Sequence, residues 1–280
     1  MPLTTIAPIL KKAQNEGYGV GAFNFINMET LEGIITAAES LNSPLIVGVP
    51  ERLSSILDLN TLSAMALLRI ERSSIPIALH LDHSKNFTNT MKAIRFGFSS
   101  VMFDGSALPF EENISQTRRI VEIAHAVGVS VEGEVGYVGR DIDAETLNPD
   151  LFTKVEQAVE FVKETGVDAL AISYGSVHGI YKGTPHLDFK RLDDIRHAVD
   201  VPLVLHGGSG LSDSDFIHSI ELGVSKINIF TDISEAGVAV CKDMSGNKLE
   251  LALLMDEIRK KTVEIVEEKI KVFGSAGKAW

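Results

Sequence analysis

Hydrophobic positions along the chain fall into short aliphatic runs, separated by longer stretches in which apolar residues recur at helical spacing. A new run begins about every 25 to 35 residues. Short apolar runs that alternate with periodic helices predict βαβ units and a parallel sheet. The predicted strands are residues 18–25, 44–49, 75–82, 99–103, 129–135, 169–173, 202–206 and 226–229.

Eight such units within ~250 residues are typical of a closed (β/α)8 barrel, the TIM barrel. A doubly wound open sheet is the alternative, but it usually has fewer strands and favours a Gly-rich turn after its first strand. Here the first strand ends in Phe23, Asn24 and Phe25. Since no linker or repeat interrupts the pattern, we expect residues 1–280 to form one α/β barrel domain. An N-terminal helix and extra C-terminal helices, at about 249–273, complete the prediction.

The composition narrows the class of function. The chain is 45% hydrophobic but only 6% aromatic, which suits aliphatic strands in an α/β core. Its formal net charge of −12 argues against binding to nucleic acid or to an anionic membrane. The single cysteine, Cys241, rules out an intrachain disulfide and favours a reducing compartment. Since the sequence shows no signal peptide and no membrane span, we expect a cytoplasmic protein.

Polar residues gather at the predicted strand ends, where the reactive side chains of a barrel lie. His83, His178 and His206 follow the third, sixth and seventh strands, so all three are expected on one rim. Three neutral imidazoles with an open fourth position describe a catalytic zinc site. Histidine ligands would also accept cobalt or iron. For each histidine alone, the alternative is a hydrogen-bonded rim residue.

Carboxylates accompany these histidines. Strand alternation should point the side chain of Asp82 away from that of His83 while keeping it near the metal. There it would exchange a proton with a substrate hydroxyl, or alternatively hold an imidazole tautomer. Glu132 and Glu134 share one face of the fifth strand, so one is a candidate metal ligand and the other a supporting group. Spacing alone does not divide these two roles, and Asp104 is expected to support a ligand.

Glycines gather after the sixth and seventh strands. Glycine lets backbone N–H groups approach phosphate oxygens, and a following helix N-terminus adds a favourable field. A phosphate site formed by the loops after strands 7 and 8 recurs in barrels. The pattern therefore predicts a phosphate-binding loop, followed by the turn from Asn228 to Thr231. Its residues are Gly179, Gly207, Gly208, Ser209 and Gly210.

Seven segments, in order and spread over nearly the whole chain, resemble the class II fructose/tagatose-bisphosphate aldolase family. Together they are highly specific. The resemblance implies a metal-dependent lyase that reversibly cleaves a ketose phosphate to dihydroxyacetone phosphate and an aldehyde. The segments are GAFNF at 21–25, HLDHS at 80–84, SSVMFDGS at 99–106, EGEVG at 132–136, YGSVHGIYKG at 174–183, LVLHGGSGL at 203–211 and KINIFTD at 226–232.

The resemblance also implies a role for each site residue. Asp82 would take the proton of the C4 hydroxyl, and Asn228 would hydrogen-bond the enediolate. One Zn²⁺ per subunit would act as a Lewis acid on the C2 and C3 oxygens of the substrate. The metal ligands would be His83, His178 and His206, with Glu134 able to approach. The residues that contact the substrate, with a monovalent cation beside its 1-phosphate, would be Asn24, Gly179, Gly207, Ser209, Asn228 and Thr231.

The segment after the second strand departs from the family pattern. Many members carry a serine there, whereas this chain reads VPERL at 49–53. It resembles the branch that acts on the inositol-derived 6-phospho-5-dehydro-2-deoxygluconate. Arg52 is a candidate for binding a distal anionic group, and its alternative is a surface salt bridge with Glu51 or a helix residue. Candidate substrates are fructose or tagatose bisphosphate, the inositol-derived acid and a sulfonated ketose phosphate.

A long loop over Gly136–Asp150 is the predicted lid. Within it, Asp141 is the nearest counterpart of the family's acid that protonates the enediolate. Arg140 is a candidate contact for an anion when the lid closes.

Two other readings stay open from the sequence. A (β/α)8 metallohydrolase would use the same histidines to activate water, but it would leave the phosphate loop and Asn228 without a purpose. A non-catalytic subunit would be marked by loss of a metal ligand or of Asp82, and neither is lost. The family's relatives are dimers or tetramers, so the resemblance implies a homodimer or homotetramer. It also implies that the molecule bound in the site is a small sugar phosphate.

Overall fold

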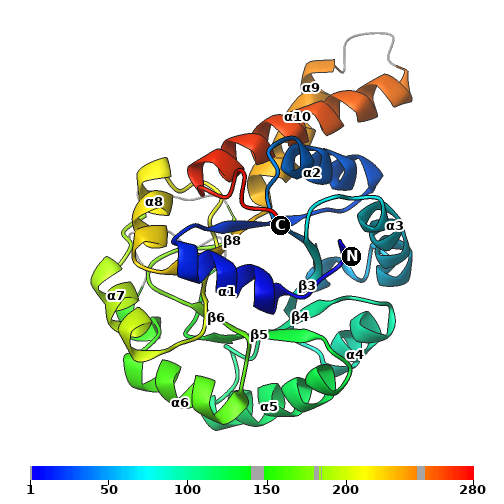
Figure 1. Ribbon diagram of the computed structural model, residues 1–280. Helices are drawn as coiled ribbons and strands as arrows, with labels where there is room; N and C mark the ends of the chain where they lie inside the picture. The colour runs from blue at the N-terminus through cyan, green and yellow to red at the C-terminus, as the bar shows by residue number, and fades with distance from the viewer. Residues whose placement is uncertain (1, 140–147, 180–182, 184, 245–249) are drawn as a thin grey trace.

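Eight parallel strands close into a barrel in the order of the sequence. The computed structural model describes residues 2–139, 148–179, 183, 185–244 and 250–280. Pairing of the first strand with the last closes the ring, so the predicted (β/α)8 barrel is confirmed (Figure 1). The strands are β1 (Val20–Asn24), β2 (Leu45–Pro50), β3 (Ile77–Ser84), β4 (Ser100–Phe103), β5 (Ser130–Val135), β6 (Ala169–Ile172), β7 (Leu203–Leu205) and β8 (Val224–Ile229).

Helices alternate with the strands and form the outer layer of the barrel (Figure 1). Their apolar faces pack against the outward side chains of the strands in one large buried cluster. The helices are α1 (Ile6–Glu16), α2 (Met28–Ser40), α3 (Leu59–Glu71), α4 (Phe87–Arg95), α5 (Phe110–Ala126), α6 (Val155–Thr165), α7 (Phe189–Ala198), α8 (Asp213–Glu221), α9 (Thr231–Met244) and α10 (Leu251–Val272), with short 3-10 turns at Glu51–Leu53 and Pro149–Leu151.

A second apolar cluster fills the half of the barrel interior that lies toward the amino ends of the strands. Helix α1 closes that end by burying Ile6, Ile9 and Leu10 against it, and Figure 1 shows this helix lying across the barrel opening. The interior is narrow, so small and branched residues dominate. The strand residues of this cluster are Val20, Ala22, Ile46, Ala78, Met102, Ala169, Ala171 and Val204.

The inner face of the barrel changes from apolar to polar toward the carboxyl ends of the strands. Side chains alternate along a strand, so residues two apart share a face. On β3, for example, buried Ala78 is followed by buried His80 and Asp82. The same step on other strands places Asn24, Glu134 and Asn228 at the polar end. The barrel therefore has an apolar base and a buried polar rim.

Helices α9 and α10 form an arm beside the barrel. Their outer ends extend beyond the ring of helices (Figure 1), and α10 packs against α2 and α9. The predicted C-terminal helix at 249–273 is observed as α10, apart from Leu249, which lies outside the described residues. Val238, Leu251 and Leu253 on this arm are more than half exposed, at 52%, 68% and 59%. Among the described residues, every helix is too short or too polar to traverse a bilayer.

Candidate active site

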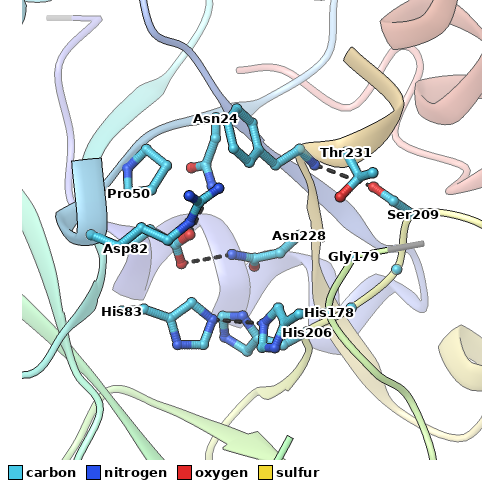
Figure 2. Close-up of a pocket in the computed structure, with 14 residues that line it drawn as sticks. Asn24, Pro50, Asp82, His83, His178, Gly179, His206, Ser209, Asn228 and Thr231 are labelled. Atoms are coloured by element: carbon cyan, nitrogen blue, oxygen red, sulfur yellow. Dashed lines mark hydrogen bonds between the residues drawn. The ribbon is translucent and has the colours of Figure 1, made fainter. Parts of the chain in front are cut away.

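A cavity opens at the carboxyl ends of the strands. The structure brings most of the predicted site residues to its wall, and Figure 2 shows their side chains around it. Among the predicted residues, Glu132, Glu134, Asp104 and Gly210 do not line this wall. Arg140 and Asp141 lie outside the described residues. The predicted residues on the wall are Asn24, Arg52, Asp82, His83, His178, Gly179, His206, Gly207, Gly208, Ser209, Asn228 and Thr231.

The three predicted histidines meet on one side of the cavity. The ring centroids of His83 lie 4.6 Å from His178 and 4.2 Å from His206. One nitrogen from each ring falls within 4.8 Å of the others, which is the spacing of a possible metal site. The Nε2 atoms of His83 and His178 are 2.9 Å apart. Two ring nitrogens this close either share a proton or share a metal ion.

Carboxylates fix the orientation of two of these rings. Nδ1 of His83 donates to Asp104 at 3.1 Å, and Nε2 of His206 donates to Glu132 at 2.8 Å. These contacts leave Nε2 of His83 and Nδ1 of His206 as the nitrogens without a carboxylate partner, and Nδ1 of His206 has no hydrogen-bond partner among the described residues. Hydrogen bonding of a carboxylate to the distal ring nitrogen is typical of metal-binding histidines. The residues present therefore fit a divalent ion.

The two imidazoles with carboxylate partners titrate differently. Burial lowers the pKa of His206, and the nearby charge of His83 lowers it further, so His206 is neutral. Burial acts in the same direction on His83, but Asp82, Asp104 and Glu134 outweigh it and raise the pKa of His83 to about 9. The proton on His83 is the one that a metal ion would displace.

The structure separates the roles of Glu132 and Glu134, which sequence spacing left open. Glu132 binds His206, as described above. Glu134 Oε2 lies 3.6 Å from Nδ1 of His83, on the side of that ring that faces Asp104. With His83 and Asp104 it forms a second group of three close ligand atoms. Burial and the charge of Asp104 raise the pKa of Glu134 well above its ordinary value.

Asp82 lies beside the histidines but is held by amides. Its two carboxylate oxygens accept hydrogen bonds from Asn24 at 2.7 Å and from Asn228 at 2.9 Å (Figure 2). Burial disfavours its charged form, but the charges of His83 and Lys226 outweigh burial and hold the pKa of Asp82 below its usual range. Asp82 is therefore an ionised carboxylate that is aimed into the cavity and available to accept a proton.

The backbone at His83 departs from a regular strand. Its φ of 51° lies in the left-handed region, and the pairing of β3 with β4 shifts register between Leu81 and Ser84. Strand alternation predicted that Asp82 and His83 point apart, and this prediction is wrong because the bulge turns both side chains to one cavity. Backbone strain of this kind costs about 1–3 kcal/mol and clusters at functional sites.

The predicted phosphate loop surrounds the N-terminus of α9. Gly207 has a φ of 68°, and a Cβ atom there would lie 2.3 Å from the carbonyl oxygen of Val177. The hydroxyl of Ser209 accepts from the backbone N–H groups of Phe230 and Asp232, each at 3.4 Å. Thr231 begins the helix between them. This end of the cavity therefore presents backbone donors and a hydroxyl, as an anion site requires.

Arg52 also lines the cavity. Its guanidinium carbon is 5.5 Å from the centre of the Phe230 ring, a cation–π contact. The carboxylate of Glu51, the sequence-based alternative partner, accepts a hydrogen bond from Asn89 instead. Arg52 is the one lysine or arginine among the described residues that line the cavity.

Lys226 begins the predicted strand at 226–229 and was not among the predicted site residues. It is the third residue of β8 and is fully buried, with Nζ 2.7 Å from Glu132 Oε2. The sequence did indicate that Lys226 faces the barrel interior, because it precedes Asn228 by two positions and residues two apart on a strand share a face.

The sequence and the fold of this chain are similar to those of known proteins. Residues 4–278 match the sequence family described as fructose-bisphosphate aldolase class II. A protein of Alkalicoccus urumqiensis named sulfofructosephosphate aldolase is 40% identical, over 97% of this chain and 96% of its own. A 6-phospho-5-dehydro-2-deoxy-D-gluconate aldolase of Shouchella clausii is 42% identical, over 100% of this chain and 97% of its own. The crystal structure of the YdjI aldolase from Escherichia coli K12 superposes with a TM-score of 0.91 at 37% identity, covering 99% and 100% of the two chains.

Proposed function

The chain belongs to the class II fructose-bisphosphate aldolase family, and we propose that it cleaves an anionic ketose 1-phosphate to dihydroxyacetone phosphate and an aldehyde. It is an aldolase, a lyase, of a family that is generally metal-dependent. The observation that carries the specific proposal is the group of three imidazoles beside an ionised, amide-held Asp82. This combination supplies a metal site and a base on one wall of one cavity.

The proposed metal ligands are Nε2 of His83, Nε2 of His178 and Nδ1 of His206. Three imidazoles suit a catalytic zinc ion with an open position for substrate. When bound, the ion supplies Lewis-acid polarisation of the substrate carbonyl. Glu134 is a candidate fourth ligand if its side chain rotates past His83.

Asp82 is the proposed base. It is ionised and can accept the proton of the C4 hydroxyl as the C3–C4 bond breaks. Asn24 and Asn228 hold the carboxylate through one oxygen each, so the remaining lone pairs can face the substrate. We further propose that Asn228 donates to the substrate's C3 oxygen as charge develops, and that Asn24 contacts the substrate at the other oxygen of Asp82.

The loop around Ser209 is the proposed site of the 1-phosphate. Backbone N–H groups at Gly179 and Gly207, the Ser209 hydroxyl and the α9 N-terminus at Thr231 provide the donors. Fixing the phosphate positions the reacting carbons and lowers the entropic part of the barrier. A monovalent cation beside the phosphate is part of the proposal, since the net charge of −12 disfavours an anion.

Arg52 is the proposed contact for the distal anionic group of the substrate. A guanidinium suits a phosphate, carboxylate or sulfonate through paired hydrogen bonds. The related proteins bear names with different distal groups, sulfofructosephosphate in one and a phosphorylated deoxygluconate in another. We propose that Arg52 takes part in this selection, with Arg140 as a second contact and Asp141 as the acid that protonates the enediolate.

A panel of ketose phosphates tests the proposal. Release of dihydroxyacetone phosphate would be followed through a coupled NADH-consuming reductase, before chelation, after chelation and after zinc add-back. We expect chelator-sensitive turnover that zinc restores, and a fastest substrate with two anionic ends. The variant R52A should raise KM for that substrate at least tenfold and leave a substrate without the distal anion unaffected. Zinc bound at one ion per subunit without turnover of any substrate would contradict the proposal.

Two alternative functions were left open by the sequence, a metallohydrolase and a non-catalytic subunit. The family match argues against a metallohydrolase. Asp82 and the three histidines are all in place, which argues against a non-catalytic subunit. We also propose a homo-oligomer, a homodimer or homotetramer, because the arm of α9 and α10 exposes apolar side chains beside the barrel. A cytoplasmic setting remains part of the proposal.

A further inference from the structure

We infer that Lys226 is a positioning residue for the metal centre: it holds the side chain of Glu132 in place, and Glu132 in turn holds His206 with Nδ1 toward the metal. This inference rests on the proposed metal site. Lys226 touches neither substrate nor metal in this role, and acts through two intervening side chains.

The three side chains form a linear chain of contacts inside the barrel. Lys226, Glu132 and His206 are each fully buried. Nζ of Lys226 lies 2.7 Å from Oε2 of Glu132, and the other oxygen, Oε1, accepts from Nε2 of His206 at 2.8 Å. The carboxylate thus bridges an ammonium and an imidazole, with one oxygen assigned to each.

The ammonium of Lys226 pairs with the carboxylate of Glu132. Its Nζ makes no hydrogen bond with any other described residue, so its charge is directed to Glu132. The distance is that of an ion pair, although its angles are not those of an aligned hydrogen bond. Burying an unpaired ammonium or an unpaired carboxylate is costly, so each charge requires the other.

His80 cannot replace Lys226 as the partner of Glu132. Its Nε2 lies 3.8 Å from Oε2 of Glu132, which is too long for a hydrogen bond. Its Nδ1 is engaged with the hydroxyl of Ser100 at 2.8 Å. Lys226 is therefore the charged group in contact with this carboxylate among the described residues.

Loss of the ammonium has a definite structural consequence. Oε2 of Glu132 would lose its partner Nζ, and the carboxylate would be held by its contact with His206 alone. The carboxylate is then free to turn, so Nε2 of His206 no longer faces a fixed acceptor. The ring loses the contact that directs Nδ1 toward the metal. Metal affinity, rather than proton transfer at Asp82, is the property that should suffer.

The variant K226M tests this, because methionine retains most of the length of lysine without its charge. We expect K226M to bind Zn²⁺ and Co²⁺ about 10- to 100-fold more weakly in competition with a chelator, which is the usual effect of losing support for a ligand. We also expect a changed visible absorption spectrum of the Co²⁺-loaded protein. The control is K85M, since Lys85 lies 3.5 Å from the Asp104 carboxylate but is 61% exposed. K85M should change the Kd less than twofold.

A double-mutant cycle separates positioning from bulk packing. In E132Q the glutamine still offers an oxygen to His206 but no charge to Lys226. If Lys226 acts through Glu132, the double variant K226M/E132Q should bind metal within about twofold of E132Q. This comparison also stands if K226M alone fails to fold, because the double variant leaves no unpaired buried charge.

Three results would overturn the inference. They are a folded K226M with the wild-type Kd, a tenfold further loss in the double variant, and an equal loss in K85M. Failure of the wild-type protein to bind metal at one ion per subunit is a different outcome, since it would contradict the proposed function itself.

Discussion

Asp82 and Asp104 show how contacts give two similar residues different roles. Both are buried carboxylates beside His83, and both have a lowered pKa despite burial. The carboxylate oxygens of Asp104 accept hydrogen bonds from Nδ1 of His83 and from the hydroxyl of Ser106. Among the described residues, Asp82 accepts hydrogen bonds only from the amides of Asn24 and Asn228. The first arrangement fits the proposed support of a metal ligand, and the second fits the proposed base.

Exchanging each acid for its amide should therefore have opposite signatures. We expect D82N to lower kcat about 100- to 10,000-fold, the usual contribution of a general base, with the metal Kd within about threefold of wild type. D104N should instead weaken metal binding about 10- to 100-fold, because the Nδ1–H of His83 loses its charged acceptor. Steady-state kinetics at saturating zinc and chelator competition measure the two effects. A D82N enzyme whose loss is entirely in metal affinity would contradict the division of roles.

His80 predicts a pH dependence of stability. Burial, assisted by the charge of Lys226, lowers the pKa of His80 to about 4. Its value in the unfolded chain is about 6.5. Between these pH values the unfolded chain binds a proton that the folded chain does not. The free energy of unfolding should therefore fall as the pH drops from about 6.5 to 4, by about 3 kcal/mol from this residue.

Urea unfolding of the chelated protein at several pH values from 7.5 to 4.5 measures this loss. The variant H80N retains an amide near the Ser100 hydroxyl but cannot titrate. It should lose less stability than wild type over the same range, although His206, whose pKa is also lowered, still contributes in both proteins. Parallel pH profiles for the two proteins would show that His80 is not the source.

At the scale of single residues, sequence could identify the chemistry but not its detailed geometry. His83, His178 and His206 could be predicted because each lies at or after the carboxyl end of a predicted strand, and parallel strands end on one rim. The pairing of Glu132 with His206 could not, since it depends on which inward side chains meet across the barrel. The left-handed backbone of His83 also leaves no mark in the sequence, because histidine rarely adopts it.

At the scale of elements, strands place the residues and glycines shape the loops between them. Gly207 follows β7 with a φ of 68° and lies against the carbonyl of Val177 in the preceding loop. A side chain at this position would meet both a backbone strain and a steric overlap. Gly128 follows α5 with a similar φ of 75° but has open space around it. Substitutions at Gly207 and Gly128 therefore separate the effect of backbone strain from the effect of steric overlap.

We expect G207A to raise KM for the substrate at least tenfold, because the phosphate loop must move away from Val177. G128A should carry only the cost of a left-handed alanine, about 1–2 kcal/mol of stability, with an unchanged KM. Substrate kinetics and urea unfolding of the two variants measure these effects. Equal KM values in G207A and G128A would show that the close approach at Gly207 does not shape the site.

Sequence periodicity predicts the elements themselves well. Each predicted strand end lies within two residues of the observed one. Strand β3 is the instructive case, since it continues past the predicted end at Asp82 to Ser84. Apolar periodicity cannot mark that extension, because its last residues are polar and serve the site. The lid acid Asp141 falls outside the described residues and stays a prediction.

At the scale of the whole molecule, an apolar barrel base and a polar rim coexist with a net charge of −12. Such a field repels an anionic substrate at long range. In the proposed function, attraction comes from local groups, namely the α9 N-terminus, Arg52 and the metal. Composition does not identify these groups, whereas the closed barrel shows that Arg52, Thr231 and the three histidines face one cavity.

The arm of α9 and α10 carries the last prediction, the oligomeric state. Val238 and Leu253 expose 52% and 59% of their surface, and Val238 also lines an apolar groove between α2 and the arm. If a second copy covers this face, a charge there should oppose association because it would be buried in an apolar contact. We expect V238D and L253D to weaken self-association at least tenfold.

Sedimentation velocity over a range of protein concentrations measures that association. The matched control is V127D, since Val127 is 61% exposed at the end of α5, away from the arm. Wild type and V127D should sediment as the same dimer or tetramer, while the arm variants shift to a smaller species as the concentration falls. Unchanged assembly in both arm variants would place the interface elsewhere, and a monomeric wild type would contradict the proposed oligomer. Since the arm begins at Thr231 in the proposed phosphate site, activity measured on the dissociated variants would also show whether assembly supports catalysis.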